Sequence, residues 1–344
     1  MSAMSSLLIR GAGALFIAGF AAFSGAKAQE AFFKGKTITI ICFSGPGGPY
    51  DTYSRLLSRH LSRYIEGNPQ VIVKYLTGAG GLLAARNLAE AAPRDGTTIG
   101  SISRTMIYEP LIGANAAKID YSKFGWLGSM AQSTAIYVSW RTSKVKTAQD
   151  LLEHEMLVAG TGAASETTIV SSALNGILGT RIKLINGYSG GPAAMLALEA
   201  GEVDGGFPTL EALKTDRPDW IGSGKINLLF QARQIANPEL PGVPVASVLA
   251  KTDLQRQSLD FLFPRDVIGR PFITPPGLPP ERLKILQDAF NATTRDRELL
   301  AEAASMQQPI KLTRGEELAA VVGEAYATPT SIVDYVKQFV PKEQ

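Results

Sequence analysis

The hydrophobic and polar positions of this chain change period near its first glycine-rich stretch. Residues 37–43 form an apolar, β-branched run without alternation, and residues 53–65 place apolar side chains at helical spacing. The first pattern is typical of a strand buried on both faces, and the second of an amphipathic helix. Between them residues 45–49 read Gly-Pro-Gly-Gly-Pro, and Asp51 or Thr52 is expected to cap the helix. This stretch predicts a strand, a glycine loop and a helix N-terminus, where a carboxylate is favoured.

The same order of strand, glycine loop and helix recurs along the chain. Further strands are predicted at residues 70–75, 97–103, 135–140, 156–159, 181–185, 203–207 and 226–231, and helices at 82–92, 167–178, 192–200 and 281–294. This alternation favours parallel sheets with helices on both faces. Glycine loops at residues 45–49, 77–81, 160–165 and 187–191 each follow a strand, and in open α/β sheets such loops share the edge where ligands bind.

The first 28 residues have the features of a secretion signal. Arg10 supplies a positive charge, residues 11–25 are apolar and rich in small side chains, and Ala26-Lys27-Ala28 fits the A-x-A cleavage pattern. The apolar run is short for a membrane span, so an uncleaved anchor is the weaker alternative. We therefore expect cleavage near Ala28 and a periplasmic location. Loss of Arg10 and Lys27 lowers the net charge from +3 to +1.

Length and composition favour a globular protein of two domains. The chain has 344 residues, of which 45% are hydrophobic and 19% are charged. Basic residues are interspersed with acids, which argues against a nucleic-acid partner. Cys42 is the single cysteine, so no internal disulfide can form. His60 and His154 are far apart in the sequence and give no metal-ligand pattern, and the glycine loops lack nucleotide-binding fingerprints, so no metal or cofactor is expected.

One motif points to a different class of protein. Residues 187–191 match G-x-S-x-G between a strand and a helix, the context of a hydrolase nucleophile elbow. That fold needs a histidine after the serine, but both histidines precede Ser189. An exported serine hydrolase using Ser189 is therefore an alternative, and we predict no catalytic residue. Arg104 and Arg233 each follow a strand and could pair with a ligand carboxylate.

The loops and turns together resemble the Bug receptors, the extracytoplasmic solute-binding proteins of tripartite tricarboxylate transporters. The matching stretches occur in one order along nearly all of the chain after residue 28: Pro46-Gly47-Gly48 with Asp51, then residues 78–81, 93–97, 160–162, 188–191 and 201–204, then Arg233 with residues 238–244, and finally residues 275–279. The resemblance implies a two-lobed periplasmic-binding-protein (Venus flytrap) fold without catalysis. Each lobe would be a mainly parallel sheet flanked by helices. Residues 29–131 and 232–344 would form lobe 1 and residues 132–231 lobe 2, with crossings near Ala131 and Ala232 acting as a hinge.

The resemblance also implies where a ligand binds, because family receptors hold carboxylates between loops of both lobes. Carried onto this sequence, the ligand-binding residues are Phe43, Ser44, Gly45, Pro46, Gly47, Gly48 and Asp51 in lobe 1, and Gly160, Thr161, Gly162, Ala163, Ala164, Ser165, Tyr188, Ser189, Gly190, Gly191, Pro208 and Thr209 in lobe 2. The implied partners are a small organic acid and the membrane subunits of the transporter, and the receptor is expected to be a monomer. A receptor that signals to a membrane sensor is the remaining alternative.

Two departures from the family pattern bear on the ligand. Lys74–Thr77 lacks an asparagine that is usual before the second glycine loop, and Glu166 follows the third loop where a histidine is common nearby. An acid beside the pocket would repel a multiply charged anion. This departure disfavours citrate-like ligands and leaves monocarboxylates, amides and aromatic acids.

Overall fold

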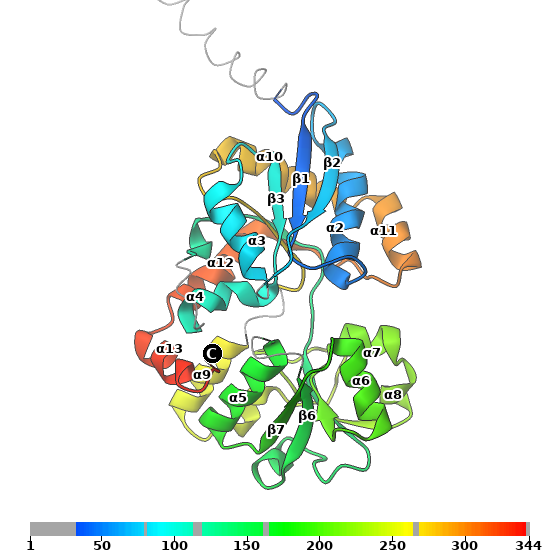
Figure 1. Cartoon of the computed structure of the whole chain (residues 1–344), viewed down its shortest axis with the longest axis vertical. Coiled ribbons are helices and arrows are strands. Elements are labelled where there is room, and N and C mark those ends of the chain that lie inside the picture. The colour runs from blue at the N-terminus through cyan, green and yellow to red at the C-terminus, as the bar shows by residue number, and fades with distance from the viewer. Residues whose placement is uncertain (1–31, 79–80, 113–118, 161–164, 264–267, 342–344) are drawn as a thin grey trace, which may run out of the picture.

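The chain folds into two lobes, each built on its own sheet (Figure 1). A computed structural model describes residues 32–78, 81–112, 119–160, 165–263 and 268–341. The predicted signal peptide lies outside these residues. In the described ranges, none of the helices is long and apolar enough to cross a bilayer.

The first sheet has the strand order β11-β4-β10-β3-β1-β2. Its strands are β1 (Thr37–Cys42), β2 (Gln70–Tyr75), β3 (Thr98–Ser101), β4 (Gly125–Ser129), β10 (Pro271–Thr274) and β11 (Thr313–Arg314). β1 pairs in parallel with both β2 and β3, while β10 runs antiparallel to β3 and β4. The β-branched side chains Ile38 and Ile40 of β1 are fully buried, as the unbroken apolar run predicted.

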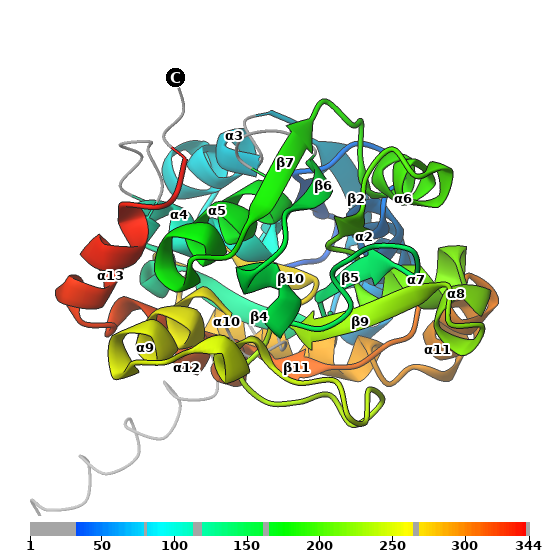
Figure 2. The same ribbon diagram turned by 90° about the horizontal axis from the view of Figure 1, so that it is seen from below.

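The second sheet has the order β7-β6-β8-β5-β9. Its strands are β5 (Ile136–Trp140), β6 (Met156–Gly160), β7 (Ile182–Asn186), β8 (Gly205–Gly206) and β9 (Ile226–Gln231). β6 is parallel to β7 and β8, whereas β5 is antiparallel to β8 and β9. Figure 2 shows this lobe from below, with α5 (Glu166–Leu178) and α6 (Gly191–Ala200) beside β6 and β7.

Both sheets are therefore mixed, and the expectation of mainly parallel sheets was wrong. The antiparallel strands flank the two crossings: β4 leads into the first and β5 leaves it, while β9 leads into the second and β10 returns to the first sheet. β4 leaves the first sheet toward the second lobe, and β10 enters the first sheet from the second lobe. The two strands therefore run in opposite directions. The sequence did not predict the strands β4, β10 and β11.

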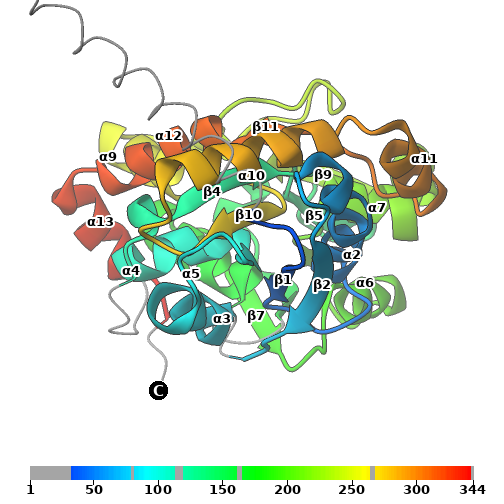
Figure 3. The same ribbon diagram turned by 90° about the horizontal axis from the view of Figure 1, so that it is seen from above.

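Helices cover both faces of each sheet. The α-helices of the chain are α2 (Pro49–His60), α3 (Leu82–Arg86), α4 (Glu109–Ile112), α5 (Glu166–Leu178), α6 (Gly191–Ala200), α7 (Leu210–Asp216), α8 (Asp219–Gly222), α9 (Asp253–Leu262), α10 (Pro280–Thr293), α11 (Arg297–Ser305), α12 (Gly315–Tyr326) and α13 (Thr330–Lys337). Short 3₁₀ turns lie at Leu61–Tyr64, Arg104–Tyr108, Tyr121–Lys123, Gln149–Leu152 and Ala246–Leu249, and α3 continues as a π-helix over Asn87–Ala91. Figure 3 shows α10 and α12 along β4 and β10 of the first sheet.

The segment after the second crossing does not return directly to lobe 1. Leu249, Leu259 and Phe263 are buried in the same apolar cluster as Val158 of β6 and Leu174 of α5. Residues 246–263 were assigned to lobe 1 from the sequence, but these three side chains lie in the core of the second lobe, whereas Phe261 lies in a cluster with side chains of the first lobe. An amphipathic segment does not specify in its sequence which sheet will cover it. The other lobe boundaries stay predictions.

Candidate functional site

The first glycine loop leaves the carboxyl edge of the first sheet together with two other loops. Cys42 at the end of β1 lies opposite Tyr75 of β2 and Ser101 of β3. Beyond the strands, Leu76 N–H donates to the Cys42 carbonyl at 3.0 Å, and Phe43 N–H donates to the Ser101 carbonyl at 3.2 Å. In Figure 1 the carboxyl end of β1 points toward the second lobe. Residues 43–48 are therefore held at the edge that faces the other lobe.

The Asp51 carboxylate forms hydrogen bonds that hold this loop. The residue is only 4% exposed, and its carboxylate accepts hydrogen bonds from Gly47 N–H at 2.9 Å, Arg55 Nε at 2.7 Å and Tyr75 Oη at 2.6 Å. Gly47 has a φ of +90°, a conformation that favours glycine. The N-cap of α2 is Gly48, without a side-chain cap, so the expectation that Asp51 or Thr52 caps the helix was wrong. Pro49 at the first helical position places the helix start three or four residues earlier than those caps would.

Electrostatics support this role for Asp51. Burial alone would raise the pKa of the Asp51 carboxyl, but the hydrogen bonds from Tyr75, Gly47 and Arg55 outweigh burial and lower this pKa. The hydrogen bond to Asp51 raises the pKa of Tyr75. The ionised carboxylate is thus engaged by three donors of the chain, and we infer that it positions the loop rather than the ligand.

Aromatic rings and arginines line the same edge. The rings of Phe43 and Tyr50 meet edge to face with centroids 4.6 Å apart, and Tyr50 Oη accepts a hydrogen bond from Arg104 N–H at 3.1 Å. The Arg270 guanidinium lies 4.6 Å from the centre of the Tyr50 ring. Within the described residues, Arg270 Nε is buried and has no hydrogen-bond partner. Two aromatic rings and two arginines therefore lie beside the first glycine loop.

The second sheet brings its own loops to one edge. Gly160 at the end of β6 lies opposite Asn186 at the end of β7, and Tyr188 N–H donates to the Gly160 carbonyl at 3.3 Å. Ser165 caps α5 through its hydroxyl, which accepts a hydrogen bond from Thr168 N–H at 3.3 Å. Thr161, Gly162, Ala163 and Ala164 lie outside the described residues.

Several predicted ligand-binding side chains make bonds within the second lobe. The Tyr188 hydroxyl donates to Glu202 at 3.2 Å, and its ring packs against the apolar cluster that contains Leu198. Thr209 caps α7 by accepting from Ala212 N–H at 3.2 Å, and the Pro208 carbonyl accepts from Ile136 N–H at 2.9 Å. Ser189 and Gly191 are exposed, while Gly190 is half-buried. In the first lobe, Ser44 Oγ lies 3.5 Å from Cys42 Sγ, and Gly45 and Gly48 have room around them.

The histidines do not complete a catalytic site around Ser189. His60 is buried in the first lobe, where its Nε2 lies 2.6 Å from Glu302 Oε2. His154 is exposed in the turn before β6, at the amino end of the strand and thus at the opposite edge from the loops. Neither arrangement gives Ser189 a general base.

An ion pair joins the two edges. Arg104 Nη2, on the 3₁₀ turn that follows β3, lies 2.5 Å from Glu166 Oε2, on the first turn of α5. The two side chains are 15% and 35% exposed. Arg104 was considered in the sequence as a carboxylate partner and Glu166 as an acid beside the pocket. Their direct contact brings the loops of both lobes to one place, and no pattern in the sequence signalled it.

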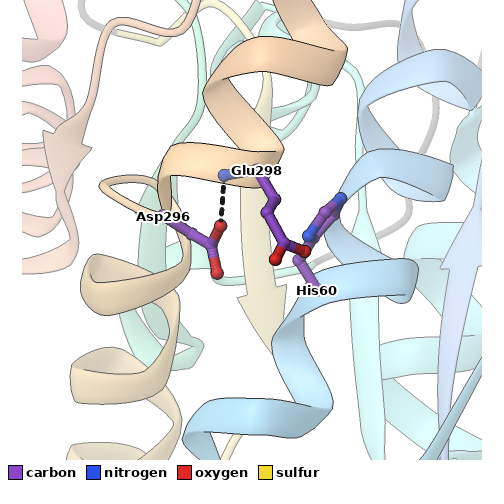
Figure 4. A group of neighbouring side chains, drawn as sticks. All are labelled: His60, Asp296 and Glu298. Atoms are coloured by element: carbon purple, nitrogen blue, oxygen red, sulfur yellow. Dashed lines mark hydrogen bonds between the residues drawn. The ribbon is translucent and has the colours of Figure 1, made fainter.

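A second cluster of polar side chains joins α2 to α11. Candidate metal-ligand atoms of His60, Asp296 and Glu298 lie within 4.8 Å of one another (Figure 4), and His60 Nδ1 is buried without a partner among the described residues. However, Arg63 contacts Asp296 at 3.1 Å and Glu298 at 2.6 Å, and Tyr64 also donates to Asp296. A cation would have to displace this guanidinium, so we interpret the cluster as an ion-pair network that holds the two helices together.

Two further cavities lie between elements of the two lobes. One of about 490 Å³ is lined by polar residues near the crossings, among them Thr134 and Arg233 of the second lobe and Gln308 and Lys311 of the first. The other, of about 310 Å³, lies between α9, α12 and α13. The residues that line these two cavities do not include the glycine loops. Arg233 donates to the Thr134 hydroxyl at 3.1 Å, and so lies apart from the pair formed by Arg104.

Comparison of sequences gives relatives named as UPF0065 proteins. The "UPF0065 protein in the TAR-I ttuE-ttuC' intergenic region" of Agrobacterium vitis is 29% identical over 197 residues, which cover 52% of each chain. This chain therefore spans about half the length of that relative. A UPF0065 protein of Bordetella bronchiseptica is 26% identical over 277 residues, or 78% of this chain and 76% of that one.

Comparison of structures gives solute-binding proteins. A TctC solute-binding protein from Polaromonas without ligand aligns with a TM-score of 0.65 and 16% identity over 87% of this chain and 98% of that one. MatC from Rhodopseudomonas palustris with bound malate has a TM-score of 0.62 and 20% identity, covering 88% and 99%. A second R. palustris protein, with adipate, has a TM-score of 0.61 and 17% identity, covering 88% and 97%. These matches confirm the periplasmic-binding-protein fold.

The family follows from a match to residues 55–307, the larger part of the chain. These residues match the model described as "Tripartite tricarboxylate transporter family receptor". This match confirms the resemblance seen in the glycine loops. It also confirms the prediction that the chain is a receptor rather than an enzyme. The chain belongs to the receptor family of the tripartite tricarboxylate transporters, whose members are solute-binding proteins.

Proposed function

We propose that this receptor captures a small organic acid between its two lobes and presents it to the membrane subunits of a tripartite tricarboxylate transporter. The observation that carries the proposal is the Arg104–Glu166 contact, through which the loop-bearing edges of both sheets meet. Donors at these edges, two arginines and the amides of the glycine loops, suit a carboxylate, whose charged oxygens accept hydrogen bonds about twice as strong as neutral ones. The malate and adipate held by the two structural relatives agree with this ligand class.

In this proposal, binding shifts the population of lobe arrangements. A ligand that touches loops of both lobes stabilises the closed arrangement by its differential affinity for that state. The predicted ligand-binding residues of both edges, including those outside the described ranges, form the proposed contact surface. Asp51, Tyr188 and Thr209 would act by holding the loops, because the chain already uses their polar atoms.

The same proposal includes export and a monomeric receptor. Residues 1–28 would direct the chain to the periplasm and be removed near Ala28. A single chain contains both edges of the proposed site, so no second copy is needed to complete it.

A thermal-shift screen of the exported protein tests the ligand class. The panel contains mono-, di- and tricarboxylates, aromatic acids and their amides. A ligand at a hundred times its dissociation constant adds about 2.7 kcal/mol to the free energy of unfolding and visibly raises the melting temperature. We expect one class of acid to do so, and no acid raising the melting temperature would contradict the proposal.

A pair of glycine variants locates the site. Gly47→Ala should abolish the ligand-induced shift, because it disturbs the loop at a positive φ of +90°. Gly35→Ala is the matched control: its φ is +72°, its surroundings are equally open, and it precedes β1 at the opposite edge. If Gly47→Ala keeps the shift, the site is elsewhere, and if both variants lose it equally, the loss does not locate the site. If ligand binds but deletion of the receptor leaves its uptake unchanged, the sensor alternative is favoured.

A further inference from the structure

The cavity between α9, α12 and α13 has the size and position of a second binding site. Its volume is about 310 Å³, at the lower end of the range of small-molecule sites, which is about 300–1,000 Å³. Tyr108 lines it from the first lobe, and Asp260 lines it from α9, a helix partly buried in the second lobe (Figure 1). A molecule bound in this cavity would therefore contact both lobes at a distance from the glycine loops.

Carboxylate, hydroxyl and amide groups form the polar part of the lining. The polar side chains that line the cavity are Tyr108, Gln234, Gln257, Asp260, Glu324 and Thr328. Among the described residues that line it, none is a lysine, an arginine or a histidine. The buried side chains of Val321, Ala325 and Ile332 add an apolar surface from α12 and α13. This combination favours a ligand that carries a positively charged donor next to a hydrocarbon.

Tyr108 contributes a buried hydroxyl that has no partner. The residue is 9% exposed, and its ring packs against Phe261, but in the described part of the chain its hydroxyl forms no hydrogen bond. Burial raises the pKa of Tyr108, so the hydroxyl stays neutral and can accept a hydrogen bond from a ligand N–H. Buried hydroxyls usually have a partner, and a ligand would supply the one that is missing here.

Asp260 contributes a carboxylate that is also without a close partner. It is partly buried, and within the described ranges its carboxylate forms neither a hydrogen bond nor a close ion pair. Burial raises the pKa of this carboxyl, whereas Arg256, which contacts Asp253 at 2.5 Å, acts in the opposite direction. Gln234 donates its side-chain N–H to the Asp260 backbone carbonyl at 2.6 Å, so its own side-chain oxygen remains an acceptor. A cation here would offset the cost of burying the carboxylate.

We propose that this cavity binds a small organic ammonium ion. The ammonium group would donate hydrogen bonds to the Asp260 carboxylate, the Tyr108 hydroxyl and the Gln234 side-chain oxygen, and the hydrocarbon part would contact the apolar side chains of α12 and α13. A hard inorganic cation fits less well, because it takes about six or more oxygen ligands and much of the lining is apolar. This site goes beyond the proposed carboxylate site, since it takes the opposite charge and shares no residue with the glycine loops.

Calorimetric titration of the exported protein with matched probes tests the proposal. The probes are phenethylammonium and hexylammonium, the neutral phenethyl alcohol, and magnesium chloride. We expect at least one of the two ammonium ions to bind saturably at millimolar concentrations. The alcohol should bind at least about tenfold more weakly than phenethylammonium, because it lacks the charge that pairs with Asp260.

Three variants locate the binding. Asp260→Asn keeps the shape of the side chain and removes its charge, so it should weaken ammonium binding at least about tenfold. Tyr108→Phe removes the hydroxyl alone and should weaken binding about fivefold, the effect of one hydrogen bond. Asp334→Asn is the matched control, because Asp334 is an exposed acid of α13 that does not line the cavity. It should leave the affinity unchanged.

Each outcome decides the proposal. If neither ammonium ion binds the wild-type protein, the site is overturned, and the same holds if the alcohol binds as tightly as phenethylammonium. Ammonium binding that Asp260→Asn leaves unchanged also overturns it. Tighter binding of magnesium, lost in Asp260→Asn, would mark the cavity as an inorganic cation site instead. The comparison of phenethylammonium with the alcohol on wild type stands even if a variant fails to fold.

Discussion

In the described part of the chain, two of the contacts between the lobes have opposite chemistry. Near α13 the contact is apolar: the ring of Tyr108 from the first lobe meets Phe261 of α9 with centroids 5.5 Å apart, and Gly176 of α5 leaves room for the ring of Phe339. Beside the glycine loops the contact is polar and consists of Arg104 and Glu166. Apolar packing is non-directional and offers no charged group to a ligand. A charged side chain of an ion pair, in contrast, can bind a charged ligand in place of its partner. The comparison suggests a persistent contact on one side and a ligand-sensitive one on the other.

Phe261→Ala tests the apolar contact and should have the largest effect. Phe261 is 5% exposed and belongs to a cluster that contains side chains of both lobes, so its truncation leaves a cavity. We expect a loss of about 3–5 kcal/mol in the free energy of unfolding, measured in urea. Leu300→Ala is the control, because Leu300 is 40% exposed on α11. A loss below about 1 kcal/mol, within the range of surface substitutions, would show that the apolar contact is dispensable.

Asp51→Ala tests a residue beside the first glycine loop that is both polar and buried. Asp51 is polar but buried, and its removal leaves Gly47 N–H and Tyr75 Oη without an acceptor. We expect a loss of about 1–3 kcal/mol in the free energy of unfolding and weaker ligand binding. Unchanged binding in this variant would mean that the loop keeps its shape without Asp51.

The pH dependence of stability gives a second test of Asp51. Its pKa is lowered from the ordinary value of 3.8 in the folded protein. A lowered pKa means that the stabilisation is fully present above pH 3.8 and is lost as the pH falls through the folded-state value. Glu302, whose pKa the hydrogen bond from His60 lowers, acts in the same direction. Melting temperatures of wild type should fall below about pH 4, and Asp51→Asn should flatten that fall; parallel curves for the two proteins would contradict this reasoning.

Tyr75→Phe should have a smaller effect than loss of Asp51. The variant removes one hydroxyl donor from a carboxylate that keeps Gly47 and Arg55. We expect a loss of about 1–2 kcal/mol in the free energy of unfolding, since the lost bond is to a charged group. Thermal and urea unfolding measure it. A loss as large as that of Asp51→Ala would show that the Tyr75 hydroxyl stabilises the loop as much as the Asp51 carboxylate does.

Glu166→Gln should change stability least of these variants. The pair is partly exposed, and such ion pairs contribute about 0–1 kcal/mol. Urea unfolding of the ligand-free protein should therefore give nearly the wild-type free energy. A loss comparable with that of Phe261→Ala would remove the distinction between the two contacts.

The local elements were predictable because their information lies in neighbouring residues. β2 and β9 have the bounds that their apolar runs predicted, and α5 and α6 begin within one residue of the expected positions. Gly201 ends α6 in a left-handed conformation, as its place after the helix indicated. The order of the glycine loops was also enough to indicate the family, since those short motifs are read directly from the chain.

Only the tertiary structure decided which segments meet. The antiparallel return of β10 to β4, the packing of α9 on the second lobe and the aromatic contact of Phe261 each join residues distant in the sequence. So does the ion pair of Arg104 and Glu166, which are 62 positions apart. The sequence by itself determined most of the strands, the glycine loops and the family, because periodicity and turn chemistry act over a few residues. Contacts between lobes depend on how two sheets face each other, and no local pattern encodes that orientation.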